Sequence, residues 1–231
     1  MRRWTGDQQG GDYSHLRGEM VAGQLERRGL HDEDVLAAMR TVPRERFVPP
    51  DLQGRAYADN ALPISHGQTI SQPYIVARMT EALRLSAWRR AHPEDRPRVL
   101  DVGTGSGYQA AILAAMGAHV VSVERDAELA AEARSRLRAL GYVVEVIVAD
   151  GSRGAPRFAP FAGIVVAAAA PAVPGPLVDQ LALDGRLVLP VGGPAEQELV
   201  VVRREGERTV IEPIEAAVFV PLVGEHGFPE R

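Results

Sequence analysis

Residues 99–108 read Val-Leu-Asp-Val-Gly-Thr-Gly-Ser-Gly-Tyr. A short apolar run leads into an acid, and three glycines then alternate at positions 103, 105 and 107. The apolar run is typical of a buried parallel strand, and the alanine-rich stretch 109–116 that follows predicts a helix. A strand, a glycine turn and a helix N-terminus together let backbone approach a ligand closely. The segment therefore predicts a ligand-binding strand-turn-helix unit.

On the C-terminal side of this unit, strand and helix patterns alternate. β-branched apolar runs predict strands at 98–102, 119–123, 143–148, 163–167 and 186–190, and helical spacing predicts helices at 107–116, 126–140 and 175–182. Strands separated by helices pair in parallel, which predicts an α/β, doubly wound, mostly parallel Rossmann-like sheet. Two further strand-like runs, 198–203 and 210–220, flank a turn at 205–207 and predict a C-terminal antiparallel hairpin.

The N-terminal part of the chain is mainly helical in pattern. Residues 1–12 are polar and glycine-rich, so we expect a frayed end without a signal peptide. Helical spacing predicts one helix over 15–28, stopped by Gly29, and a second from an Asp32 N-cap to Met39. A third helix is expected from Pro73 to about Leu85, followed by a surface loop at 86–97. These helices form an N-terminal appendage to the main sheet.

The composition excludes several kinds of chemistry. The 231 residues include no cysteine and no lysine, which excludes thiol nucleophiles, cysteine-ligated metals and Schiff-base catalysis. Six scattered histidines without a His-x-x-x-His pair predict no metal site. The net charge of −4 argues against nucleic acid as a partner. No apolar run approaches the roughly 20 residues of a membrane span, so we expect no membrane insertion and a cytoplasmic location.

Three acids mark the ends of neighbouring predicted strands. Ligands of doubly wound sheets collect at that edge, so Asp101, Glu124 and Asp150 are candidates for contacting one. Tyr108 stands where a dinucleotide fingerprint needs glycine or alanine, which favours a ligand without a pyrophosphate. Glu124 suits ribose hydroxyls, and Asp150 suits a base amine, with Gly151 admitting a flat ring. The open alternatives are a solvated charge for Glu124 and a turn cap for Asp150.

The glycine segment resembles the first motif of class I methyltransferases that use S-adenosylmethionine. More narrowly, residues 62–64 (Leu-Pro-Ile) and 67–77 (Gly-Gln-Thr-Ile-Ser-Gln-Pro-Tyr-Ile-Val-Ala) resemble the protein-L-isoaspartate O-methyltransferases. Similar matches occur at 160–161, 168–171, 179–181, 185–188 and 190–192. The resemblance extends from about residue 44 to residue 222. Its specific part is 68–74, since the glycines indicate only the superfamily.

The resemblance implies a repair reaction. Such enzymes methylate the free α-carboxylate of L-isoaspartyl residues in damaged peptides and proteins. The family's active-site serine corresponds to Ser71, although a serine before Pro73 can also be a plain helix N-cap. The implied cofactor-binding residues are Thr69, Ile70, Asp101, Gly103, Gly105, Glu124, Asp150 and Gly151. The chain departs from the family pattern at Ala149, Ala162 and Ala167, where a glycine, an acid and a threonine are usual.

The resemblance also suggests how the chain is organised. We expect residues 1–85 to form a helical and active-site-loop region packed on an S-adenosylmethionine-binding methyltransferase domain, 86–231, as a single globular unit and a monomer. His66, beside Gly67, is expected to be a loop residue rather than a proton carrier. Two alternatives remain open. One is a related carboxyl methyltransferase that acts on a peptide natural product or a small acid, and the other is a non-catalytic binding module of the same fold.

Overall fold

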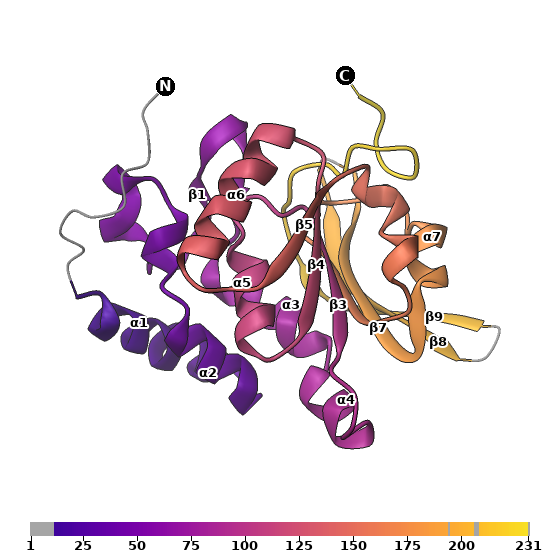
Figure 1. Ribbon diagram of the computed structural model, residues 1–231, viewed down its shortest axis with the longest axis horizontal. Helices are drawn as coiled ribbons and strands as arrows, with labels where there is room; N and C mark the ends of the chain where they lie inside the picture. Colours follow the sequence, from indigo (N-terminus) through magenta and orange to yellow (C-terminus); the bar gives the residue numbers. More distant parts are fainter. Residues whose placement is uncertain (1–11, 194, 206–207, 231) are drawn as a thin grey trace.

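The computed structural model describes residues 12–193, 195–205 and 208–230, and a seven-stranded sheet lies at its centre (Figure 1). The strands are β3 (Arg98–Val102), β4 (His119–Glu124), β5 (Val144–Val148), β6 (Phe161–Val166), β7 (Leu181–Gly192), β8 (Gln197–Glu205) and β9 (Arg208–Ala216). Their order is β5-β4-β3-β6-β7-β8-β9, parallel from β5 to β7 and antiparallel from β7 to β9. This confirms the predicted doubly wound, mostly parallel sheet with a C-terminal antiparallel hairpin.

Helices cover both faces of this sheet (Figure 1). The crossovers contain α5 (Tyr108–Ala115), α6 (Ala127–Ala139) and α7 (Gly175–Asp179), and the N-terminal part contains α1 (Ser14–Met20), α2 (Glu33–Thr41), α3 (Pro73–Ala82) and α4 (Leu85–Ala91). α1 continues as π and 3-10 turns to Arg28. A small antiparallel pair, β1 (Leu62–Pro63) and β2 (Thr69–Ile70), precedes α3. Short 3-10 helices lie at Arg44–Phe47, Pro50–Arg55, Ser65–Gly67, Gly151–Arg153 and Pro156–Phe158.

The core is divided by the sheet into two clusters. Val99 and Val165 point to the face covered by α1, α2, α3, α5 and α6. Leu100 and Ile164, their neighbours in sequence, point to the face covered by α7, where Leu177 is buried. Successive residues of a strand alternate between faces, so a strand covered on both sides is apolar throughout. The N-terminal helices contribute buried side chains to the same cluster as Val99.

The N-terminal helices begin and end as their residue types predict. Gly29 adopts a left-handed conformation with φ of 85°, which ends the first helical segment. The Asp32 side chain accepts hydrogen bonds from the backbone N–H groups of Asp34 and Val35 at 3.0 and 3.3 Å. The predicted N-cap of α2 is therefore confirmed.

The surface loop predicted at 86–97 is wrong, because α4 occupies residues 85–91. α3 ends at Ala82, and Arg84 takes a left-handed backbone conformation with φ of 53° between the two helices. Leu85 is buried, and the Arg89 guanidinium donates to the carbonyl of Met116 at 2.9 Å. Long-range contacts thus stabilise a short helix that the local sequence did not indicate. Both prolines of this segment lie beyond its end.

Several boundaries also differ from the prediction. β7 spans 181–192 rather than 186–190, and α7 ends at Asp179 instead of 182. β9 ends at Ala216, so residues 217–220 leave the sheet. Residues 1–11, expected to fray, and positions 206–207 of the predicted turn lie outside the described residues. None of the helices within the described part of the chain is long and apolar enough to cross a membrane.

Candidate active site

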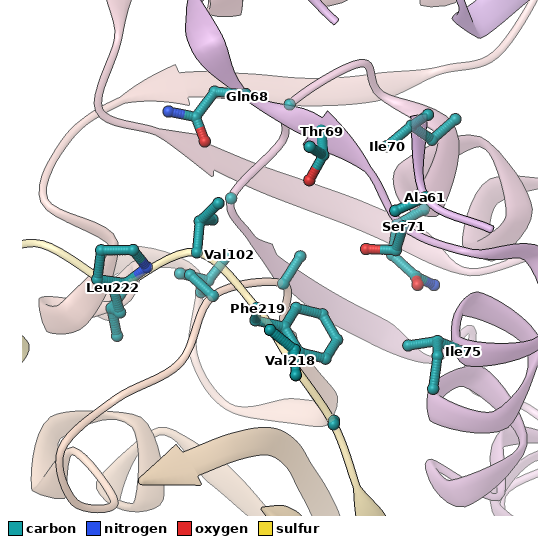
Figure 2. Close-up of a pocket in the computed structure, with 18 of the residues that line it drawn as sticks. Ala61, Gln68, Thr69, Ile70, Ser71, Ile75, Val102, Val218, Phe219 and Leu222 are labelled. Atoms are coloured by element: carbon teal, nitrogen blue, oxygen red, sulfur yellow. The ribbon is translucent and has the colours of Figure 1, made fainter. Parts of the chain in front are cut away.

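A cavity of about 1040 Å³ opens at the carboxyl ends of β3 and β4 (Figure 2). Three parts of the chain meet there: the loop 67–72, the ends of the central strands, and the segment 216–223 that follows β9. This is the edge at which parallel α/β sheets bind ligands. The wall includes Thr69, Ile70, Ser71, Gly103, Gly105, Glu124 and Gly151, but neither Asp101 nor Asp150.

The glycine turn forms the floor of the cavity. Gly103, Gly105 and Gly107 have φ angles of 88°, 52° and 90°, in the left-handed region that favours glycine. The backbone N–H of Gly103 donates to the carbonyl of Val123 at 2.8 Å, which ties the turn to β4. Because no side chain projects from Gly103 or Gly105, the backbone itself is available to a ligand.

Glu124 ends β4 and is held rigidly at the wall. One carboxylate oxygen accepts from Gly105 N at 3.0 Å, and the other accepts from the N–H groups of Arg125 and Asp126 at 2.9 and 3.1 Å. The residue is only 7% exposed. The structure therefore replaces the alternative of a solvated strand-end charge with a fixed acceptor that faces the cavity. Contact with ribose hydroxyls stays a prediction.

Asp101 lies one residue before the end of β3, whose bounds match the predicted strand 98–102, but its side chain does not line the cavity. Its side chain is fully buried, and one oxygen accepts from the Ser122 hydroxyl at 2.7 Å. The other oxygen has no hydrogen-bond partner among the described residues. Burial raises the pKa of Asp101 to about 7, against the effect of the Ser122 hydrogen bond. The carboxyl group thus lies beneath the glycine turn with one free oxygen.

Asp150 takes the capping role that its sequence position left open. One oxygen accepts from the N–H and the hydroxyl of Ser152 at 2.9 and 2.7 Å, and the other accepts from Glu225 N at 2.8 Å. Burial opposes ionisation of this carboxyl, but the hydrogen bonds from Glu225 and Ser152 leave its pKa below the ordinary value. Its contact with a base amine stays a prediction. The adjacent Gly151 does line the cavity, and a Cβ there would lie 2.6 Å from Val102.

The backbone of Ser71 is fixed by a hydrogen bond, whereas its side-chain hydroxyl is available to a ligand. Its carbonyl accepts from the buried Arg44 guanidinium at 2.8 Å. The N-cap of α3 is Gln72, without a side-chain cap bond, so Ser71 is not the plain N-cap that was the alternative. Within the described part of the chain the Ser71 hydroxyl makes no hydrogen bond, and Figure 2 shows it beside the cavity near Ile75.

Two contributors to the site were missed or undervalued from sequence. Arg44 donates to Ser71 and to the carbonyl of Ala56 at 2.7 Å, and its guanidinium lies 4.9 Å from the ring centre of Tyr108. Burial lowers the pKa of Arg44 to about 10. Phe219, in the segment that follows β9, also lies on the cavity wall. A lone arginine in a connector gives no sequence signal for such a position.

These residues fit S-adenosylmethionine as a ligand. The cavity volume is at the upper end for small-molecule sites, which leaves room for a cofactor and part of an acceptor. Bare glycine backbone and the Glu124 carboxylate on the cavity wall suit a ligand with hydroxyl and cationic groups. Of the unusual alanines, only Ala167 lines the cavity, opposite Gly103. Fold and site together define a class I methyltransferase that uses S-adenosylmethionine.

Comparison with known proteins identifies the family. The model of the protein-L-isoaspartate(D-aspartate) O-methyltransferase family matches residues 17–227. A protein-L-isoaspartate O-methyltransferase from Methanoregula boonei is 53% identical over 216 residues, covering 93% of this chain and 96% of that protein. One from Aeropyrum pernix is 48% identical over 235 residues, covering 99% and 87%. The chain belongs to the protein-L-isoaspartate O-methyltransferase family.

Solved structures agree with this assignment. A protein-L-isoaspartate O-methyltransferase structure superimposes with a TM-score of 0.78 at 26% identity, covering 91% of this chain and 67% of that chain. A beta-aspartate methyltransferase from Plasmodium falciparum, in complex with S-adenosyl-L-homocysteine, gives 0.74 at 25% identity, covering 93% and 99%. The resemblance, the fold class and the cofactor inferred from sequence are confirmed.

Proposed function

We propose that this protein transfers a methyl group from S-adenosylmethionine to the free α-carboxylate of L-isoaspartyl residues in damaged peptides and proteins. Family membership over nearly the whole chain supports this function. The observation that carries it is that the family-specific loop, Gln68–Ser71, and the glycine turn, Gly103–Gly105, line one cavity. The acceptor and the methyl donor can therefore meet there.

The residues of this cavity suit a direct transfer. When bound, S-adenosylmethionine supplies a methyl group on a cationic sulfur, and the new C–O bond forms as the C–S bond breaks. A carboxylic acid ionises near pH 4, so the acceptor needs no general base at neutral pH. The free hydroxyl of Ser71 can donate to one acceptor oxygen and hold the other in line with the methyl group. Glu124, held in place by Gly105 N–H, and the bare glycine backbone of the turn would hold the donor.

Apolar side chains around the cavity mouth exclude water from the reacting groups. Ile70 and Ile75 contribute from the loop and α3, and Phe219 contributes from the segment after β9 (Figure 2). Opposite charges meet and cancel during the transfer, so a dry site strengthens their attraction. Val218 is 91% exposed, which leaves an apolar contact for the acceptor peptide at the rim.

The test is a transfer assay with paired peptides. Purified protein is incubated with methyl-labelled S-adenosylmethionine and either an isoaspartyl peptide or its aspartyl twin. We expect labelled ester only with the isoaspartyl peptide. Equal transfer to both would contradict the substrate assignment, and transfer to neither with intact binding of S-adenosylhomocysteine would favour a different acceptor acid. Absence of both transfer and binding would favour a non-catalytic module.

We also propose a cytoplasmic monomer without nucleic-acid or membrane partners. A chain without cysteine needs no oxidising compartment to fold, and its net charge of −4 disfavours phosphate backbones. The proposed division into a helical region, 1–85, and a cofactor-binding domain, 86–231, is compatible with their shared hydrophobic cluster. Light scattering of the purified protein would test the monomer.

A further inference from the structure

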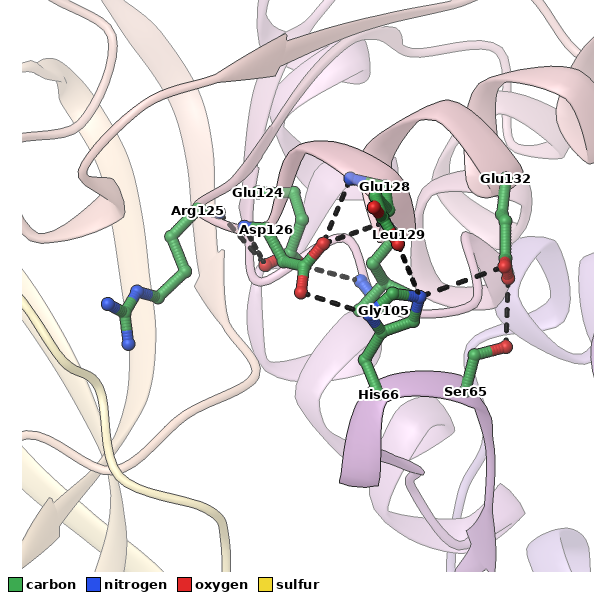
Figure 3. A network of polar contacts seen from close by, with 9 residues as sticks. All are labelled: Ser65, His66, Gly105, Glu124, Arg125, Asp126, Glu128, Leu129 and Glu132. Atoms are coloured by element: carbon green, nitrogen blue, oxygen red, sulfur yellow. Dashed lines mark hydrogen bonds and ion pairs between the residues drawn. The ribbon is translucent and has the colours of Figure 1, made fainter.

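His66 lies in the loop between β1 and β2 and faces three carboxylates, one from the N-cap of α6 and two from α6 itself (Figure 3). Its Nδ1 is 3.2 Å from an oxygen of Asp126, and its Nε2 is 3.9 and 3.8 Å from oxygens of Glu128 and Glu132. The hydroxyl of Ser65 donates to Glu132 at 2.8 Å. Two consecutive loop residues are therefore attached to the first two turns of one helix. No group of acids and histidines in the described ranges is arranged to hold a metal ion.

The backbone conformation of His66 also indicates that surrounding contacts hold this residue in place. Its φ of 59° is in the left-handed region, where a residue with a side chain is disfavoured. Such a conformation persists when surrounding contacts fix it. The next residue, Gly67, continues the left-handed turn with φ of 67° and lines the cavity. The contacts of His66 thus determine where the loop 67–71 begins.

The charged groups around the imidazole are mainly acidic. The oxygens of Glu124 accept from backbone N–H groups, and the Arg125 side chain points away from His66 (Figure 3). Arg125 donates to Glu230 at 2.5 Å. Arg136, further along α6, donates to the carbonyl of Ser106 at 2.7 Å and is attracted by Glu132. When protonated, His66 is therefore the cation that faces Asp126 and Glu128.

The pKa of Asp126 agrees with this charge arrangement. The hydrogen bond from Leu129 N lowers it, burial acts in the opposite direction, and the charge of His66 lowers it further. Asp126 thus stays ionised and available to pair with a protonated imidazole.

The two sides of this contact belong to the two halves of the cavity wall. Residues 67–71 carry the proposed acceptor-binding hydroxyl of Ser71, and Glu124–Asp126 carry the proposed ribose contact. The ion pair therefore connects the acceptor loop to the cofactor edge, outside the reacting centre.

We propose that His66 is a positioning residue that clasps the loop 65–71 to the N-terminus of α6 when protonated and loosens this loop when neutral. The clasp closes the wall over the methyl donor, so it increases affinity for the donor and its product. This inference extends the proposed function but depends only on cofactor binding.

The direction of the pH effect follows from histidine chemistry. Histidine ordinarily changes charge between pH 5 and 8, and the lowered pKa of Asp126 keeps that carboxylate ionised over this range. The ion-pair part of the clasp is present at the acidic end and is lost as the pH rises. The His66 side chain is 25% exposed, so solvent screens the pair, and we expect a two- to fivefold effect on affinity.

The experiment measures S-adenosylhomocysteine affinity by calorimetry at pH 6 and pH 8 for the wild type and His66→Gln. Glutamine keeps a hydrogen-bond donor but cannot become charged. We expect the wild type to bind about two- to fivefold more tightly than the variant at pH 6, with the difference gone at pH 8. Asp101 also titrates in this range, but it is present in both proteins and cancels in the ratio.

His15→Gln is the matched control, because His15 pairs with Glu19 at 3.5 Å on the exposed surface of α1. We expect it to follow the wild type at both pH values. Asp126→Asn, which keeps a good N-cap residue, should reproduce the His66→Gln result. A wild-type to His66→Gln ratio that is the same at both pH values would overturn the proposal.

A second measurement separates a positioning role from a general loss of structure. We expect amide hydrogen exchange at pH 6 to be faster in His66→Gln over residues 65–71 and unchanged in β6. In the transfer assay the KM for S-adenosylmethionine should rise about two- to fivefold, with kcat changing less. Unchanged exchange in the loop, or equal acceleration throughout the chain, would contradict the clasp.

Discussion

Ser71 combines a fixed backbone with a free hydroxyl. The buried guanidinium of Arg44 holds its carbonyl, while the hydroxyl faces the cavity without a partner among the described residues. A group placed in this way can meet a ligand without breaking an existing bond. Its position is therefore more informative than its residue type, since serine before proline is also common at helix N-termini.

Ser71→Ala is predicted to impair transfer and spare cofactor binding. A hydrogen bond to a charged acceptor contributes about 1.5 to 3 kcal/mol, so kcat/KM for an isoaspartyl peptide should fall by about 10- to 150-fold. Affinity for S-adenosylhomocysteine should stay within about twofold, because the hydroxyl acts on the acceptor. Ser135→Ala, an exposed position on α6, is the control and should behave as the wild type. Unchanged turnover in Ser71→Ala would remove Ser71 from the site.

Asp101 is predicted to make stability depend on pH. Its pKa is near 4 when unfolded and about 7 when folded, so the folded state retains the proton more strongly. That contribution is fully present below about pH 4 and is lost as the pH rises through 7. Relative to Asp101→Asn, the wild type should lose about 1 to 4 kcal/mol of unfolding free energy between pH 5 and 8. Urea unfolding without cofactor measures this, and parallel curves for the two proteins would contradict it.

At the scale of elements, the local hydrophobic pattern was sufficient to predict a helix or strand where its apolar residues are the ones that become buried. β3, α5 and α6 could be predicted because apolar residues recur at strand or helix spacing beside clear glycine and aspartate signals. α4 could not, since its helix is stabilised by Leu85 in the core and by Arg89 on the carbonyl of Met116. Long-range contacts determine whether such a helix forms, because its own sequence pattern is typical of a loop.

The residues of the candidate site also divide into those that the sequence pattern could place and those that it could not. Glu124 and the glycines could be placed at the sheet edge, because a strand's carboxyl end follows from its pattern. Asp101 was correctly placed in the strand 98–102, but its full burial follows from the packing around β3 and not from its own sequence position. Arg44 is 27 residues from Ser71 in sequence, so only the folded chain brings them together.

On the scale of the whole molecule, the cavity joins three segments that are distant in sequence. Residues 67–72 come from the N-terminal part, 102–106 and 123–126 from the centre, and 216–223 from beyond the last strand. A ligand that contacts all three acts as a cross-link present only in the folded state. Cofactor binding should therefore stabilise the complete fold and not a single element.

S-adenosylhomocysteine is accordingly predicted to raise the melting temperature. At 100 times its dissociation constant, a ligand that binds only the folded state adds about 2.7 kcal/mol. For a chain of this size each kcal/mol is equivalent to about 2 to 4 °C, so calorimetric scans should show an increase of about 5 to 10 °C. At the same ligand concentration Glu124→Gln should show a smaller increase, and Glu19→Gln, on the exposed surface, should match the wild type. An increase in Glu124→Gln equal to that of the wild type would show that the fixed carboxylate at the end of β4 makes no contact with the cofactor.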